Sequence, residues 1–216
     1  NPRLFHDQIE YIINHAKDRV MFLDTTWVEM MEGMQDKCPT IEKFIILCDS
    51  GKMPKTTLRN AVCFEDLLAA EDDTFDWPEF DEKTAVALCY TSGTTGNPKG
   101  VLYTHRGMVL HAIAGTSSDH PLCISSRTVL LPAVSMFHVH GWMAPYAAPI
   151  SGTKLVLPGP NMHGDNICRL LEEEKVTVTA GVPTIWIDVL QHLKKTGGRL
   201  DTLEICNIGG SAPSIS

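Results

Sequence analysis

Apolar residues recur with a helical period near the start of the chain. They follow the spacing i, i+3, i+4, i+7 at Ile9, Ile12, Ile13 and Ala16. This spacing places the four side chains on one face of a helix. The sequence therefore predicts a helix over residues 7–18.

Two short apolar runs follow, at Val20–Leu23 and Phe44–Leu47. Runs of this length are typical of strands that are buried on both faces. Between them we expect a second helix that ends before Cys38. Its apolar face is carried by Trp27, Val28, Met30, Met31 and Met34. The order helix, strand, helix, strand indicates a parallel α/β unit.

Residues 71–83 are rich in acidic side chains and contain Pro78. This composition predicts a solvated surface connection. We therefore place a boundary near residue 82. The predicted organisation is a partial α/β subdomain at 1–82 and a second α/β subdomain at 83–216, truncated at its C-terminal end.

Apolar runs and helical patterns alternate through this second subdomain. Strands are expected at Ala85–Tyr90, Val101–Tyr103, Thr128–Leu131, Lys154–Leu157, Val176–Thr179 and Leu203–Ile208. Helices are expected at Gly107–Ala114, Asn166–Glu174 and Thr184–Leu193. Such alternation favours the α/β fold class with largely parallel sheets in both subdomains.

Composition and charge exclude several classes of protein. The 216 residues are 44% hydrophobic and carry a net charge of −8, so a nucleic-acid partner held through its phosphates is not expected. No apolar stretch reaches the roughly 20 residues of a membrane helix, and the N-terminus lacks a signal-peptide pattern. The seven cysteines are scattered singly, which argues against a disulfide framework or a zinc ribbon. We expect reduced thiols and a cytoplasmic location.

The segment Thr91–Gly100 contains three glycines, several hydroxyl side chains and Lys99. Glycines let backbone N–H groups approach an anion, and lysine adds a positive charge. This composition predicts a loop that binds a triphosphate. It is not the Walker loop, because Lys99 is followed by Gly100 and an apolar run rather than by Ser or Thr and a helix. We expect the loop to join two strands; a polar hairpin loop without a ligand is the alternative.

Thr91–Gly100 resembles the signature phosphate loop of the adenylate-forming superfamily. That superfamily includes acyl-CoA synthetases, firefly luciferase and the adenylation domains of peptide synthetases. Three later segments resemble parts of the same superfamily, in the expected order: Met136–Trp142, Ala180–Thr184 and Gly209–Pro213. Others look most like medium- and long-chain fatty-acyl-CoA synthetases: Asn1–Leu4, His15–Asp18, Tyr146–Ile150 and Leu157–Pro160. The resemblance implies part of the N-terminal domain of the adenylate-forming fold.

The resemblance also assigns roles to individual residues. Phosphate binding falls to Thr91, Ser92, Gly93, Thr94, Thr95, Gly96 and Lys99, and contact with the nucleotide to Gly210, Ser211 and Ala212. His138 would lie beside the reacting carboxylate and the α-phosphate as the catalytic residue. Phe137 and Trp142 would line the acyl channel, although a Trp142 packed in the core is almost as good an interpretation. His138 and His140 lack a third metal ligand at suitable spacing, so no metal held by protein ligands is expected.

The implied activity is that of an ATP-dependent fatty acid–CoA ligase. A carboxylate attacks the α-phosphate of MgATP, giving an acyl-adenylate and pyrophosphate, and the thiol of coenzyme A then displaces AMP. ATP, Mg²⁺, coenzyme A and a carboxylic acid are the implied small molecules, and a homo-oligomer is left open. The alternatives are another adenylate-forming enzyme that activates an aryl or amino acid, and a non-catalytic nucleotide-binding module.

Both ends of the sequence suggest a piece of a longer protein. The chain begins with Asn1 and ends just after a Gly-rich turn that normally leads into a helix. It lacks the Tyr-Gly-x-Thr-Glu segment whose Glu holds Mg²⁺ in the superfamily, the later ribose-binding Asp and the C-terminal domain with its lysine. We therefore expect a fragment of the large N-terminal domain with little or no ligase activity of its own.

Overall fold

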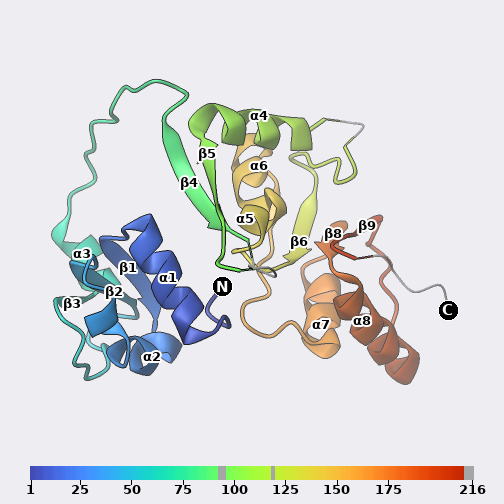
Figure 1. Cartoon of the computed structure of the whole chain (residues 1–216). Helices are drawn as coiled ribbons and strands as arrows, with labels where there is room; N and C mark the ends of the chain where they lie inside the picture. Colours follow the sequence, from blue (N-terminus) through green and yellow to red (C-terminus); the bar gives the residue numbers. More distant parts are fainter. Residues whose placement is uncertain (92–95, 118–119, 212–216) are drawn as a thin grey trace. The chain divides into compact units, whose positions relative to one another are not determined.

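The computed structural model describes residues 1–91, 96–117 and 120–211. The described chain forms two compact units (Figure 1). The first comprises Asn1–Asp81 and Tyr90–Leu102, and the second Glu82–Cys89 and Tyr103–Ser216. These units are compact groups of residues, and the subdomain boundary expected near residue 82 remains a prediction.

The first unit is built around a three-stranded parallel sheet in the order β1-β2-β3. Its elements are α1 (His6–Ala16), β1 (Val20–Asp24), α2 (Val28–Glu32), β2 (Lys43–Leu47), β3 (Ala61–Cys63) and α3 (Phe64–Ala70). The first helix, the first two strands and their parallel pairing are as the sequence predicts. The third strand and α3 were not expected.

One helix of the first unit is not continuous as predicted. The segment around α2 is divided into the 3-10 turn η1 (Thr25–Trp27), α2 itself and a second 3-10 turn, η2 (Gln35–Lys37). The Asp24 carboxylate accepts a hydrogen bond from the backbone N–H of Thr26 at 2.8 Å, which caps a new turn directly after β1. At the other end Gly33 stops α2. The apolar stripe nevertheless faces inward, because Val28, Met31 and Met34 are all buried.

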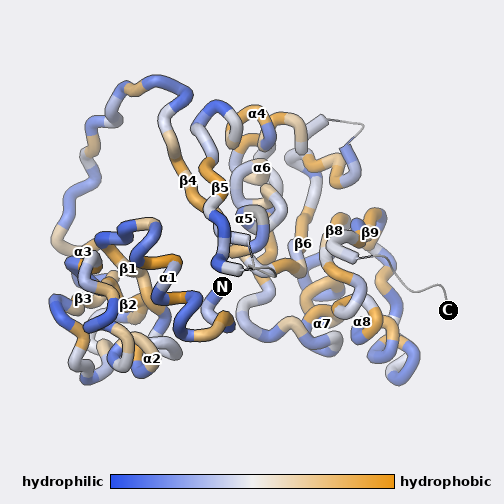
Figure 2. Tube along the Cα trace, viewed as in Figure 1, coloured by the Kyte–Doolittle hydropathy of each residue, from blue (hydrophilic) through white to orange (hydrophobic). Residues whose placement is uncertain are grey.

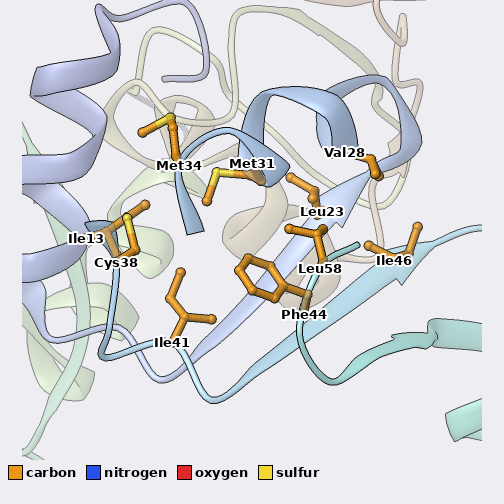
Figure 3. Close-up of a cluster of buried hydrophobic side chains, with 10 residues drawn as sticks. All are labelled: Ile13, Leu23, Val28, Met31, Met34, Cys38, Ile41, Phe44, Ile46 and Leu58. Carbon is orange, nitrogen blue, oxygen red and sulfur yellow. The ribbon is translucent and has the colours of Figure 1, made fainter. Parts of the chain in front are cut away.

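The core of this unit lies between the sheet and its helices (Figure 3). Phe44 and Ile46 of β2 are both fully buried, and Ile13 of α1 and Met31 of α2 pack in the same cluster. The guanidinium of Arg59 lies 6.0 Å from the centroid of the Phe44 ring. The middle strand is therefore the centre of packing in this unit.

The connection from α3 to β4 is polar and irregular (Figure 2). It leads into β4 (Ala85–Tyr90), which pairs with β5 (Gly100–Thr104) in a two-stranded sheet. The prediction that the segment 91–100 joins two strands is thus confirmed. Directly after β5, the Thr104 hydroxyl accepts from the backbone N–H of Gly107 and caps α4 (His105–Gly115).

The second unit contains a four-stranded sheet in the order β7-β6-β8-β9, in which every pair is parallel. Its strands are β6 (Val129–Ala133), β7 (Lys154–Leu155), β8 (Val178–Gly181) and β9 (Ile205–Ile208). Besides α4, the unit contains the helices α5 (Val139–Trp142), α6 (Ala144–Ser151), α7 (Gly164–Glu173) and α8 (Pro183–Thr196). Figure 1 shows α7 and α8 lying side by side. The prediction of largely parallel sheets is confirmed.

Some bounds in this unit differ from the prediction. The strand expected at 176–179 lies two residues later, and the one expected at 154–157 ends at Leu155. The helix α6 was not predicted because its sequence contains Pro145 and Pro149, which usually break helices. Pro145 lies in the first turn, where proline is tolerated, while Pro149 stands inside the short helix.

Parallel register brings three loops to one edge of this sheet. Ala133 of β6 pairs with Gly181 of β8, and Gly181 pairs with Ile208 of β9. The chain therefore leaves these three neighbouring strands at the same level. Ligands bind preferentially at this carboxyl-terminal edge in parallel α/β sheets.

Replacing Phe44 by alanine should lower the free energy of unfolding by about 3–5 kcal/mol, because it leaves a cavity at the centre of the first core. Phe75→Ala is the matched control: Phe75 is 67% exposed, so its loss should cost less than about 0.5 kcal/mol. Urea unfolding followed by circular dichroism measures both. Equal costs for the two variants would contradict the proposed centre of packing.

Candidate nucleotide-binding site

The ends of the segment 91–100 are joined by a reciprocal pair of hydrogen bonds. The backbone N–H of Thr91 donates to the carbonyl oxygen of Lys99 at 3.0 Å. The backbone N–H of Lys99 in turn donates to the Thr91 hydroxyl at 3.2 Å. The first bond continues the pairing of β4 with β5, and the second uses a side chain that the sequence marked for phosphate binding. Thr91 is therefore a structural residue of the loop stem.

Between these ends, the described part of the loop has one glycine with a positive φ and one buried residue. Gly96 has a φ of 126°, a conformation that favours glycine. Pro98 is buried, whereas its neighbour Lys99 is exposed. None of the ion pairs among the described residues involves Lys99, so its ammonium group is available for an anion. The predicted phosphate contacts of Ser92, Gly93, Thr94 and Thr95 lie outside the described residues.

A tyrosine–histidine pair anchors the strand that leads into the loop. The Tyr90 hydroxyl lies 2.6 Å from Nδ1 of His15, a residue of α1. The His15 ring stacks on Tyr11, one helical turn earlier, with a centroid distance of 5.3 Å. Because Tyr90 immediately precedes Thr91, this bond ties the loop stem to α1. Sequence reasoning missed it, although His15 and Tyr11 share one helix face through their i, i+4 spacing.

The environment of Tyr90 opposes ionisation of its hydroxyl. Burial raises the pKa of Tyr90, and the negative charge of Asp18 and the presence of Tyr11 add to the effect. Over most of the pH range the phenol therefore stays protonated. As a neutral hydroxyl it can donate a hydrogen bond to Nδ1 of His15, or accept one from it, without placing a charge at the loop stem.

The second group of predicted residues lies after β6, at the carboxyl-terminal edge of the four-stranded sheet. His138 is exposed, and the Phe137 ring lies beside its imidazole with a centroid distance of 4.8 Å. The backbone N–H of His138 donates to the carbonyl oxygen of Ser135 at 3.0 Å, which closes a turn. An exposed imidazole on a tight turn is free to meet a ligand.

The chain then makes a left-handed turn. His140, Gly141, Trp142 and Met143 have φ values of 46°, 63°, 52° and 69°. A left-handed conformation costs roughly 1–2 kcal/mol for each residue other than glycine. The His138 carbonyl oxygen accepts from the N–H groups of Gly141 and Trp142, at 2.8 and 3.3 Å, which partly offsets this cost. Such strain is concentrated at functional sites in proteins.

This turn brings Trp142 against the glycine-rich segment after β9. A Cβ added at Gly209 would lie 2.9 Å from Cη2 of Trp142, closer than real contacts allow. The backbone N–H of Gly209 donates to the Gly181 carbonyl oxygen at 3.2 Å, which fixes the glycine at the end of β8. The indole is therefore packed against this segment. The contact joins two regions, Met136–Trp142 and Gly209–Pro213, that the sequence predicted to belong to one site.

The remaining predicted nucleotide contacts follow directly. Gly210 has a φ of 87°, and Val182 lies beside it. Ser211 is exposed. The predicted contact of Ala212 lies outside the described residues. Of the residues that sequence reasoning selected, the structure therefore groups Trp142 with Gly209 and Gly210, while Thr91, Gly96 and Lys99 belong to the other unit.

The fold matches those of two solved structures. An anthranilate CoA ligase, solved with anthranoyl-AMP, superposes with a TM-score of 0.81 at 20% identity over 98% of this chain and 40% of that chain. A red-emitting luciferase from Phrixothrix hirtus superposes with a TM-score of 0.82 at 21% identity over 99% of this chain and 40% of that chain. At these identities the likeness establishes the fold alone.

Sequence similarity establishes the family. Residues 1–216 match the AMP-binding enzyme family, so this chain is a member of that family, and its resemblance to the adenylate-forming superfamily is confirmed. It is 44% identical to a 3-methylmercaptopropionyl-CoA ligase of Ruegeria pomeroyi, over 98% of this chain and 39% of that protein. It is 42% identical to a medium-chain-fatty-acid–CoA ligase of Ectopseudomonas oleovorans, again over 98% of this chain and 39% of that protein.

A long-chain-fatty-acid–CoA ligase of Thermus thermophilus is 41% identical over 98% of this chain and 37% of its own length. The chain thus spans less than half the length of these curated relatives. Among the described residues, no helix is both long enough and apolar enough to cross a membrane.

Gly209→Ala should lower the free energy of unfolding by about 1–3 kcal/mol, because the new methyl group overlaps the Trp142 ring. The cost should largely disappear when Trp142→Leu is present in the same chain, since the smaller side chain can yield. A double-mutant cycle in urea unfolding measures the coupling. Gly33→Ala is the control, because its Cβ would meet its nearest neighbour at an ordinary 3.6 Å. If the changes in unfolding free energy caused by the two substitutions simply added, the contact between Gly209 and Trp142 would be contradicted.

Asp18→Asn should lower the pKa of Tyr90, because it removes a negative charge that disfavours the phenolate. Burial, the larger cause, remains, so the pKa should stay above its ordinary value. A raised pKa means that Tyr90 contributes stability below pH ~10, which is lost as the pH rises through the folded-state pKa. NMR titration of tyrosines labelled at Cζ measures the shift, with Asp7→Asn as the control. An unchanged Tyr90 titration in Asp18→Asn would be the contrary result.

Proposed function

We propose that this chain is the phosphate-binding part of an ATP-dependent carboxylic acid–CoA ligase. In this proposal the complete enzyme forms an acyl-adenylate with release of pyrophosphate, and then an acyl-CoA with release of AMP. The observation that carries the proposal is the stem of the segment 91–100, which presents an exposed Lys99 from a hairpin held by Thr91. Membership of the AMP-binding enzyme family supports it.

The first half of the reaction brings two anions together. A carboxylate must approach the α-phosphorus of a nucleotide that carries several negative charges, so catalysis consists mostly of positioning and of neutralising charge. Lys99 supplies one positive charge for the pyrophosphate that leaves. The stem hydrogen bonds fix the backbone from which its side chain extends. The role of Lys99 is therefore to hold the phosphates and to stabilise the leaving group.

His138 and the packed edge of the sheet serve the other reactant. The exposed imidazole of His138 can donate a hydrogen bond to an oxygen of the carboxylate or of the α-phosphate. Gly210 and Ser211 follow β9, where small residues allow a flat adenine ring to approach the backbone. Phe137 and Trp142 provide apolar surface in the same segment as His138, which suits an acyl chain.

The acid is proposed to be a fatty acid of medium or long chain. Two relatives that are more than 40% identical are named for medium-chain and long-chain fatty acids. A relative of slightly higher identity, 44%, is named as a 3-methylmercaptopropionyl-CoA ligase, so a short thioether acid is the second candidate. An aryl or amino acid substrate is the third, since it suits the same fold.

Other components of the reaction are proposed on the same basis. Mg²⁺ would enter with ATP and screen its phosphate charges, and coenzyme A would be the acyl acceptor. No cluster of three His, Cys, Asp or Glu side chains suited to a metal exists among the described residues. A cytoplasmic location is proposed from the seven cysteines, which are scattered singly along the sequence. That this chain alone has little or no ligase activity stays a prediction.

Lys99→Ala should weaken MgATP binding by about 10–100-fold, because a charge-assisted contact to phosphate is worth roughly 1.5–3 kcal/mol. Isothermal titration calorimetry on the protein expressed from its complete reading frame measures this. Lys195→Ala, which removes an exposed lysine from the last turn of α8, is the matched control and should bind normally. Equal affinities for all three proteins would reject the phosphate role of Lys99.

The acid is identified by ATP–pyrophosphate exchange on the same protein. Exchange driven by octanoate or palmitate would support the fatty-acid assignment, and exchange driven only by 3-methylmercaptopropionate would select the second candidate. Exchange driven by an amino acid or an aryl acid would replace the fatty acid but leave the ligase class intact. Binding of MgATP without exchange for any acid would favour the non-catalytic nucleotide-binding module.

A further inference from the structure

A cysteine and a histidine that play no part in the proposed mechanism are in direct contact. Sγ of Cys89, in β4, lies 2.9 Å from Nε2 of His140, in the left-handed turn. The two residues are 51 positions apart, so only the fold brings them together. Both are half-buried, and Cys89 is a free thiol. This is the arrangement of a nucleophile beside a general base.

Ring contacts with neighbouring side chains keep the His140 imidazole beside the Cys89 sulfur. The His140 ring makes edge contacts with Tyr103 of β5 and Tyr146 of α6, at centroid distances of 5.1 and 5.9 Å. The Cys89 thiol and these two phenols are titratable groups that face the imidazole. His140 itself has a φ of 46°, an unfavourable conformation for a residue with a side chain. The fold therefore accepts strain in the same turn that delivers the imidazole to the thiol.

We propose that Cys89 and His140 form a reactive thiol site, at which Cys89 exchanges with low-molecular-weight disulfides. Glutathione disulfide represents this class of reactant. Neither residue is among the proposed phosphate contacts. Geometry carries the proposal: a free thiol, a base within hydrogen-bond distance, and partial access to solvent.

The exchange balances without any further reactant. Nε2 of His140 takes the proton from Sγ of Cys89, and the thiolate attacks one sulfur of the disulfide. A new S–S bond forms to Cys89 as the original S–S bond breaks. The departing thiolate takes the proton back from the imidazolium and leaves as a thiol. One disulfide and one thiol are consumed, and one mixed disulfide and one thiol are produced.

The other cysteines of the chain provide internal comparisons. Cys38, Cys63 and Cys168 are buried, so a reagent reaches them slowly. Cys206 is exposed, yet desolvation of its sulfur raises the pKa of its thiol to about 11. Little of it is therefore thiolate near neutral pH. Exposure alone predicts that Cys206 reacts fastest, whereas the proposal predicts that Cys89 does.

The test measures the rate of alkylation of each cysteine by iodoacetamide at pH 7.5, followed by peptide mass spectrometry. Cys89 should react at least about tenfold faster than Cys206. In His140→Asn the Cys89 rate should fall by about the same factor while the Cys206 rate stays unchanged. Asparagine is the chosen replacement because it tolerates a positive φ but cannot act as a base. Equal rates for Cys89 and Cys206, or an unaffected Cys89 rate in His140→Asn, would overturn the proposal.

A further measurement on the unaltered protein keeps the test decisive if the variant does not fold. Oxidised glutathione should give one mixed disulfide, located at Cys89. A mixed disulfide located mainly at another cysteine would equally reject the site.

Discussion

Parallel pairing of β6, β8 and β9 constrains where the second unit can place its functional side chains. Because the three strands run in the same direction and in register at Ala133, Gly181 and Ile208, the chain leaves all three at one edge. Three segments therefore lie at the same edge although long stretches of sequence separate them: the one after β6 that contains His138, the one after β8 that begins with Val182, and the glycine-rich turn after β9. An antiparallel strand in this position would send one of these segments to the opposite edge.

At this common edge, the left-handed turn at residues 140–143 directs successive side chains toward different partners. Within a few residues the chain places His140 on Cys89 and Trp142 on Gly209. It also places Met143 in the core, where Gly115 leaves room for its terminal methyl group. A right-handed helix separates successive side chains by about 100° and could not reach the same set of partners. The contacts that result offset a backbone conformation that is unfavourable by itself.

Sequence reasoning was accurate where one residue type or one period determines the structure. The strands β1, β2, β4, β6 and β9 follow apolar runs, and the hairpin loop follows from Gly100 and the apolar residues after it. The reasoning failed where several weak signals compete. Asp24 caps a separate turn and Gly33 stops α2, so a single apolar stripe is divided among three short helices. The three-residue strand β3 is too short to show a period, and the prolines of α6 conceal a helix.

For the site, sequence reasoning could name candidate residues but not the contacts between them. The glycines, hydroxyl groups and Lys99 of the loop are recognisable because their types and spacing are rare together. The bonds between Tyr90 and His15, and between Cys89 and His140, join positions 75 and 51 residues apart. No local pattern encodes such pairings, since they arise only when strands and helices pack. Thr91 is an intermediate case: its type suggested a ligand contact, and its hydroxyl supports the stem of the loop.

The positive φ values of the left-handed turn also restrict which residue types can replace those beside the proposed acyl-binding segment. A β-branched residue at position 140 or 142 meets a steep backbone penalty before its side chain contacts any substrate. Glycine, asparagine and aspartate are admitted more readily, whatever acid the enzyme activates. The residue types found at these two positions in related enzymes therefore depend on the backbone conformation as much as on the substrate. Acyl specificity is changed more easily by substitution of Phe137, which precedes the turn.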